Sequence, residues 1–296
     1  MGQVPLSSSI APRLEIAAAR RAPSSLRAPR STHATTWRDA AGGVVAYSRA
    51  SGERYWMDLP GLATFCFDER SDHVVAAPHP GIAADAVAEL YWHSALPLVV
   101  QARGGEVLHA SGVLMPRGVV ALCGASKSGK STIAYGLHRR GYRLWADDAV
   151  ALEVTARAIT ALPLPFDVRL RPATAALFGM GNGAARLAGS DDSSEPLGRA
   201  PAPLAAVCVL DRGRGAPGSV LLTPLKASVA YPALLANAHC FSLEDPARKR
   251  LMLDRYLSLV ARVPVVALAV PDGLEGLPAM LDALERAFGE PSRNAG

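Results

Sequence analysis

The apolar positions of this chain switch repeatedly between the spacing of a strand and the spacing of a helix. Residues 118–123 form a short, almost wholly apolar run, which is typical of a strand buried on both faces. Residues 274–288 place their apolar side chains three and four positions apart, which predicts an amphipathic helix. Because such strands and helices follow one another along the chain, we expect an α/β fold in which helices cover both faces of a sheet.

The predicted elements fall into three regions. Residues 1–36 are basic and polar, with prolines and no sustained periodicity, which predicts a disordered leader. Residues 37–100 predict a small N-terminal α/β lobe, and residues 101–296 predict the main domain. The expected strands are 43–47, 63–67, 73–77, 107–113, 118–123, 142–152, 205–210, 219–222 and 263–270, and the expected helices are 83–94, 129–140, 229–238, 246–261 and 274–288.

One long segment of the main domain shows neither the apolar spacing of a strand nor that of a helix. Residues 178–203 are rich in Gly, Ser, Asp and Ala, which is typical of an exposed loop. Two interpretations stay open: an insertion without structure, or a lid that recognises the substrate.

The charge and cysteine patterns exclude several classes of protein. The net charge is +5, but residues 1–30 carry five arginines against one acid, so the rest of the chain is nearly neutral and does not predict a nucleic-acid-binding surface. Four widely separated cysteines predict free thiols in a reducing compartment. The longest apolar run, 263–270, is far shorter than the roughly 18–20 residues of a membrane helix. We expect a cytoplasmic protein, with an organellar transit peptide as the alternative interpretation of the leader.

The strongest chemical signal is the segment GASKSGKS at 124–131, which matches the phosphate-binding pattern G-x-x-x-x-G-K-[ST]. It follows a predicted buried strand and begins a predicted helix, so its backbone N–H groups and the helix dipole would face phosphate oxygens. Lys130 would reach the β- and γ-phosphates of ATP, and the Ser131 hydroxyl would coordinate Mg²⁺. The nucleotide-binding residues expected are Gly124, Ala125, Ser126, Lys127, Ser128, Gly129, Lys130, Ser131 and Thr132.

Three further residues are candidates for catalysis. Asp147 and Asp148 lie after the aliphatic stretch that follows the predicted loop helix. If the strand ends there, one carboxylate can hold Mg²⁺ and the other can accept a proton from an attacking hydroxyl, whereas an acid pair that only caps a turn is the alternative. His109 lies on the predicted strand before the loop, where a lone histidine is more often a core residue than a catalytic one.

Together these residues resemble the HPr kinase/phosphorylase family and its HPr-kinase-related proteins, which share a P-loop fold with phosphoenolpyruvate carboxykinase. The resemblance rests on His109, the loop ending at Lys130 and Ser131, and the phrase RGYRLWADD at 140–148. It implies an α/β fold with a mixed sheet flanked by helices. It also implies that Lys130 binds the transferred phosphoryl group, that Ser131 and Asp147 hold the metal, that Asp148 accepts the proton, and that His109 assists at the phosphate site.

The region that follows departs from the bacterial HPr kinases. Residues 162–172 read LPLPFDVRLRP, with neither the glutamate nor the Gly-x-Gly found in that family, which argues against phosphorolysis and against HPr as the substrate. Arg169 and Arg171 have two interpretations. They are cations that lie near the nucleotide or near an acidic group of the substrate, or they are solvated arginines at the end of a strand. This stretch resembles HPr-kinase-related proteins of peptide natural-product pathways, including kinases that phosphorylate a serine of a lasso-peptide precursor.

The function expected is therefore an ATP- and Mg²⁺-dependent kinase acting on a hydroxyl, with a serine of a peptide or small protein as the acceptor. Two alternatives stay open: a small-molecule alcohol kinase on the same scaffold, and a regulatory protein that binds ATP without transferring phosphate. A homo-oligomer is compatible with either.

Overall fold

A computed structural model describes residues 12–17, 35–38, 41–180, 185–188, 200–212, 221–239, 245–270 and 273–289. The chain divides into two units. The first comprises Met1–Gly105 and Cys240–Leu253, and the second comprises Glu106–His239 and Asp254–Gly296. The predicted boundary at residue 100 therefore lies five residues early, and 240–253, which were assigned to the main domain, belong to the first unit.

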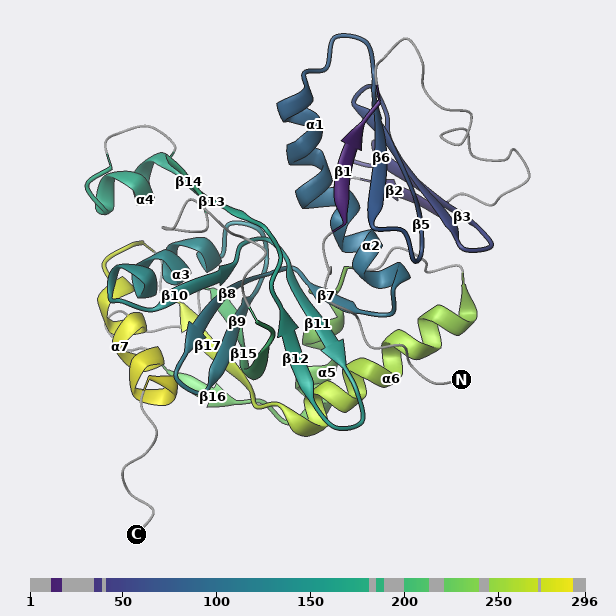
Figure 1. Ribbon diagram of the computed structural model, residues 1–296. Coiled ribbons are helices and arrows are strands. Elements are labelled where there is room, and N and C mark those ends of the chain that lie inside the picture. The colour runs from purple at the N-terminus through teal and green to yellow at the C-terminus, as the bar shows by residue number, and fades with distance from the viewer. Residues whose placement is uncertain are drawn as a thin grey trace. The chain divides into compact units, whose positions relative to one another are not determined.

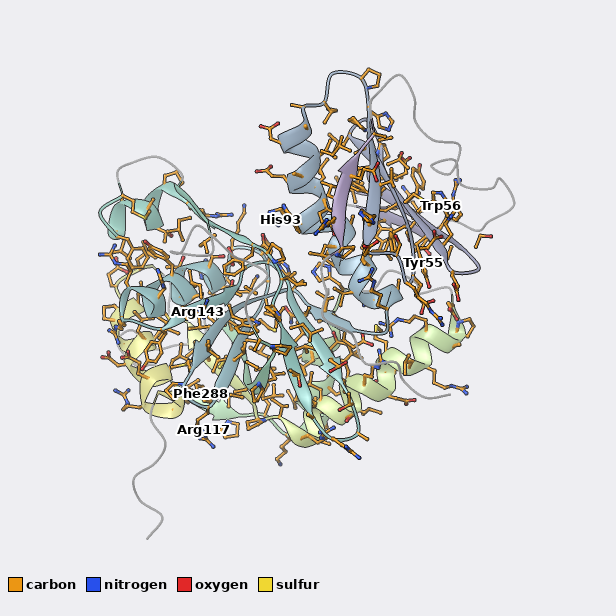
Figure 2. All side chains as sticks on the ribbon, viewed as in Figure 1. Tyr55, Trp56, His93, Arg117, Arg143 and Phe288 are labelled. Carbon is orange, nitrogen blue, oxygen red and sulfur yellow. The ribbon has the colours of Figure 1, made fainter. Side chains whose placement is uncertain are left out.

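The first unit is built on a six-stranded sheet in the order β1-β6-β5-β4-β3-β2. Alternation along β4 buries Trp56 and leaves Tyr55 on the other face, where its ring stacks on Phe67 at 5.2 Å between centroids (Figure 2). The strands are β1 (Arg13–Ile16), β2 (Thr35–Arg38), β3 (Val44–Ser51), β4 (Arg54–Leu59), β5 (Ala63–Asp68) and β6 (His73–Pro78), followed by α1 (Ala84–Leu90), the π-helical turn η2 (Tyr91–Ala95) and α2 (Leu96–Ala102).

The predicted disordered leader is wrong in part. Strand β1 lies within it and pairs in parallel with β6, and β2 begins at Thr35, before the predicted end of the leader. The hydrogen bonds of β1 come from a strand about 60 residues further along the chain, a partner that local composition does not reveal. Residues 1–11 and 18–34 of the predicted leader lie outside the described residues.

The second unit is built on a larger sheet with the order β10-β8-β9-β15-β12-β11-β7, and β17 and β16 extend from β15 (Figure 1). Strands β9, β15 and β17 are mutually parallel, whereas β8 pairs antiparallel with both of its neighbours, β9 and β10, so the sheet is mixed. Its strands are β7 (Glu106–Leu108), β8 (Ala110–Met115), β9 (Gly118–Cys123), β10 (Arg143–Ala146), β11 (Val150–Val154), β12 (Ile159–Leu162), β15 (Ala202–Arg212), β16 (Leu222–Pro224) and β17 (Val265–Val270).

Helices flank this sheet, as the sequence predicts. Helix α3 (Lys130–Arg139) and helix α7 (Leu277–Phe288) pack side by side on one face (Figure 1). Their apolar residues share a core with alternate residues of β9 and β15, and Phe288, labelled in Figure 2, closes that core at the end of α7. Helix α5 (Ala227–Leu235) and the part of α6 (Pro246–Arg262) from Asp254 onward complete the unit.

Two strands that were predicted to be continuous are each broken in two. Predicted strand 107–113 is β7 and β8 with His109 between them, and predicted strand 142–152 is β10 and β11 with 147–149 between them. The cause is a shared change of partner, because β10 pairs with β8 while β11 pairs with β7. Both breaks therefore fall at the same place in the sheet.

The predicted loop 178–203 contains a strand. In it, β14 (Ala185–Ala188) pairs antiparallel with β13 (Asp167–Leu170), and β15 begins at Ala202. A short helix, α4 (Pro172–Leu177), follows β13. Residues 181–184 and 189–199 of the predicted loop lie outside the described residues. None of the helices in the described parts of the chain is long and apolar enough to cross a membrane.

Candidate active site

The segment 124–131 connects the end of β9 to the first turn of α3. Both glycines of this segment have positive φ, +152° at Gly124 and +104° at Gly129, and Lys127 between them is left-handed at +69°. A Cβ at Gly124 would lie 2.8 Å from Ser128 Oγ and 3.1 Å from Leu210 Cβ, so only glycine fits there. Three of the eight residues of this segment therefore have left-handed or otherwise positive φ values, which only a tight turn requires.

Lys130 is held over this loop. Its Nζ donates to the carbonyl oxygens of Gly124 at 2.8 Å and Ala125 at 3.2 Å, and the side chain is buried. Burial lowers the pKa of Lys130, and the neighbouring Asp148, Cys123 and Asp147 oppose that shift. The ammonium group is thus held by two neutral carbonyl oxygens of the segment itself.

Asp147 receives two hydroxyl donors. Ser131 Oγ on the first turn of α3 donates to Asp147 Oδ1 at 2.9 Å, and Ser111 Oγ of β8 donates to the same oxygen at 2.5 Å. Asp147 is 5% exposed and Ser111 is fully buried. A buried carboxylate requires such donors, and the pair brings the predicted metal-binding residues Ser131 and Asp147 into direct contact.

His109 and Asp148 meet at the breaks in their two strands. His109 Nδ1 lies 3.1 Å from the backbone oxygen of Asp148. Since a carbonyl only accepts, Nδ1 carries the proton in the neutral ring and Nε2 is left as an acceptor. Burial, together with Lys130, lowers the pKa of His109, so the ring is neutral at pH 7. Asp148 adopts φ +63°, a left-handed conformation that such a bond helps to hold.

These groups line a cavity of about 420 Å³, within the roughly 300–1,000 Å³ that is usual for small-molecule sites. His109, Asp147 and Asp148 line one part of it, and Ser126 to Thr132 line another. Gly124 and Ala125 are not among the lining residues. Thr132 Oγ1 lies 3.2 Å from Thr174 Oγ1 at the rim. Arg171 also lines the cavity, whereas the side chain of Arg169 lies outside the described atoms.

A different part of the cavity is formed at the β15 and β17 side of the sheet. Arg212, the last residue of β15, donates from Nη1 to Lys127 O at 3.0 Å. Leu274, Leu277 and Met280, after β17 and in α7, supply apolar walls. Because β9, β15 and β17 are parallel, their carboxyl ends meet at one edge, where open α/β sheets bind ligands.

Several of the site's residues had no sequence signal. Ser111 lies in an apolar strand, and Arg212 ends one. Asn237 and His239 follow α5, more than 100 residues after the loop they approach: Asn237 Oδ1 accepts from Gly124 N at 2.9 Å, and the His239 ring lies 5.9 Å from the His109 ring. Only the sheet topology brings these positions together.

The donor set suits a hard cation. Ser131 and Asp147 offer a hydroxyl and a carboxylate oxygen, and Mg²⁺ is commonly bound by one or two such groups with water and substrate phosphates completing its shell. Across the described residues, no cluster of three or more His, Cys, Asp or Glu side chains could hold a metal by itself. The site thus fits Mg²⁺ delivered with a phosphate ligand and does not fit an all-protein metal cage.

No protein-family model matches this chain, and no curated protein matches it. Among solved structures, the chain is similar to the Hpr(Ser) kinase/phosphatase from Coxiella burnetii, with 14% sequence identity and a TM-score of 0.32 over 61% of this chain and 94% of that one.

Proposed function

We propose that this chain is a P-loop phosphotransferase, and more particularly a kinase that transfers the γ-phosphoryl group of Mg²⁺·ATP to a hydroxyl. The observation that carries the proposal is the 2.9 Å contact between Ser131 Oγ and Asp147 Oδ1 beside the loop lysine. These are the residue types that P-loop enzymes use for a metal–triphosphate complex, and here they come from two separate elements.

In this proposal, Lys130 exchanges its two backbone acceptors for phosphate oxygens, and the N–H groups of 126–131 surround the phosphates. Ser131 and Asp147 would hold Mg²⁺, which supplies charge neutralisation on the phosphate oxygens. The apolar walls at Leu274 and Met280 would take the nucleoside, because these side chains offer the base an apolar surface away from Asp147 and Asp148.

The acceptor hydroxyl would approach beside Asp148. Its carboxylate accepts the hydroxyl proton, and His109 holds the Asp148 backbone through the 3.1 Å contact at Nδ1. The side-chain acceptor Nε2 of the neutral His109 ring is a second place to which that proton can move. A serine in a peptide or small protein is the acceptor class we propose, and a small-molecule alcohol is the competing one.

The test is to incubate the full chain with Mg²⁺·ATP or Mg²⁺·GTP and panels of serine-containing peptides and metabolite alcohols, and to detect phosphate addition by intact mass. We expect transfer to a peptide serine, lost in Asp148→Asn while ATP still binds. Transfer only to a metabolite would replace the acceptor class. Unchanged transfer in Asp148→Asn would overturn the role of Asp148. ATP binding by the wild-type chain without transfer to any acceptor would favour a non-catalytic regulator and overturn the kinase proposal.

A further inference from the structure

Three residues after α5 form an unpredicted extension of the sheet. In the segment 237–239, the Asn237 carbonyl accepts from His109 N at 2.7 Å, and His239 N donates to Val107 O at 2.9 Å. Leu108 and Ala238 form an antiparallel bridge between these bonds. Backbone hydrogen bonds therefore hold the segment next to β7 and His109.

The Asn237 side chain reaches the first residue of the phosphate loop. Its Oδ1 accepts from Gly124 N at 2.9 Å, and its Nδ2 donates to Ala233 O at 2.8 Å. The two partners set the orientation of the amide, because Gly124 N can only donate and Ala233 O can only accept. Gly124 in turn presents its carbonyl to Lys130 Nζ at 2.8 Å. Asn237 thus acts on the lysine through the loop backbone.

The His239 ring reaches the proton-accepting aspartate. It packs edge-on against His109, with 5.9 Å between ring centroids and an interplanar angle of 79°, and it hydrogen-bonds the backbone of Asp148. His109 Nδ1 approaches the same backbone at Asp148 O. Burial, and then the neighbouring His109, lower the pKa of His239 to about 4, so the ring donates as a neutral group at pH 7.

We infer that the segment 237–239 positions the groups of the proposed phosphoryl-transfer site. Asn237 fixes the backbone of the loop 124–131, and His239 fixes Asp148 in its left-handed backbone conformation. The inference rests on the proposed function, because it assigns these two residues to the nucleotide and the acceptor sides of that same site. Neither residue lines the cavity, so each acts through a neighbour.

The experiment separates the two roles. In Asn237→Ala the loop loses its acceptor, and we expect the Kd for Mg²⁺·ATP to rise about tenfold with little change in kcat. In His239→Leu we expect kcat to fall about tenfold with Kd within about twofold of wild type, and His239→Gln, which keeps an N–H donor, to recover part of the loss. Slow ATP hydrolysis serves as the kcat readout if no acceptor is known.

His138→Leu is the matched control. This histidine is also half-buried and contacts a backbone oxygen, Tyr142 O, at 3.2 Å, but it lies at the far end of α3. We expect a loss of melting temperature in all of these variants and a change of Kd or kcat only in the two from the segment. Equal Kd and kcat in Asn237→Ala, His239→Leu and His138→Leu, each per folded protein, would overturn the inference.

Failure of the proposed function gives a different result. If the wild-type chain binds Mg²⁺·ATP but neither transfers nor hydrolyses it, the kinase proposal and the role of His239 fall together. The role of Asn237 then stands or falls on the Kd for Mg²⁺·ATP alone. If the wild-type chain does not bind Mg²⁺·ATP, both the proposed function and the inference are overturned.

Discussion

Ser111 and Asp147 form a buried pair: the Ser111 hydroxyl donates at 2.5 Å to Asp147 Oδ1, the carboxylate oxygen that also accepts from Ser131 Oγ. Ser111 does not line the cavity and therefore orients the carboxylate from the protein interior, whereas Ser131 lines the cavity together with Asp147. Outer partners of metal ligands commonly tune affinity in this way.

This pair gives the first prediction. Asp147→Asn keeps an oxygen for Ser111 but removes the charge, so phosphate transfer should fall on the order of 100-fold or more, because neutralisation of the phosphate charge depends on the metal. Ser111→Ala should raise the Mg²⁺ concentration for half-maximal transfer about tenfold. Titrating Mg²⁺ at fixed ATP measures both, with Ser258→Ala on α6 as the control. An unchanged Mg²⁺ requirement in Ser111→Ala would contradict the role of that hydroxyl.

The loop holds two lysines in different settings. Lys130 is buried over the loop, whereas Lys127 is exposed at its tip. Lys130→Met should weaken Mg²⁺·ATP binding by roughly 100-fold or more, because a desolvated charge on phosphate is lost. Lys127→Met should change it by no more than about threefold, because solvent screens an exposed charge. Equilibrium binding of ATP distinguishes them, and equal losses would contradict the assignment.

The buried histidine pair predicts a pH-dependent stability. His239 has a pKa of about 4 in the folded chain against an ordinary 6.5, so the unfolded chain binds more protons between these values. The free energy of unfolding should be highest above pH 6.5 and decline by up to about 3 kcal/mol as the pH falls to 4. Carboxylates titrate in the same range, so the measurement is the difference in urea unfolding between wild type and His239→Leu. Parallel pH profiles in the two proteins would contradict it.

Transfer should also decline in acid. The pKa of His109 is lowered from its ordinary value by burial and by Lys130, so the ring is neutral at pH 7 and becomes charged only below about pH 6.5. Protonation removes the Nε2 acceptor, and kcat should fall on the acid side with a midpoint below that value. In His109→Gln the acid limb should be absent from the kcat profile.

Two glycines with positive φ provide a matched comparison of strain and function. Gly124 has φ +152° and no room for a Cβ, whereas Gly141 has φ +98° with no atom within 4 Å of an added Cβ. Gly141→Ala should cost about 1 kcal/mol of stability and leave ATP binding unchanged. Gly124→Ala should lower stability further and weaken ATP binding at least tenfold, because the clash with Ser128 displaces the loop. ATP binding by Gly124→Ala at the wild-type affinity would contradict this account.

In the second unit, helices and strands were largely predictable where the apolar residues keep a regular spacing over several turns or along a whole strand. The buried strand 118–123 appears with its predicted bounds as β9, and the expected helices at 129–140, 246–261 and 274–288 are α3, α6 and α7 with small changes at their ends. In this unit, strands β12, β13 and β14 were not predicted, because each spans only four residues and so carries little periodic signal.

By itself, the sequence determined the local parts of this protein: the glycine-rich turn, the lysine and serine that follow it, and the apolar periods that bury α3 against the sheet. Each of these features depends on residues that are close together in the chain, because backbone preferences and apolar spacing extend over only a few positions. Only the tertiary structure decided that two strands break, at His109 and at 147–149, and that Ser111, Asn237 and His239 converge there. The physical reason is that strands pair with partners far away in the sequence. The order of strands in the sheet therefore sets which side chains meet where the two strands are interrupted.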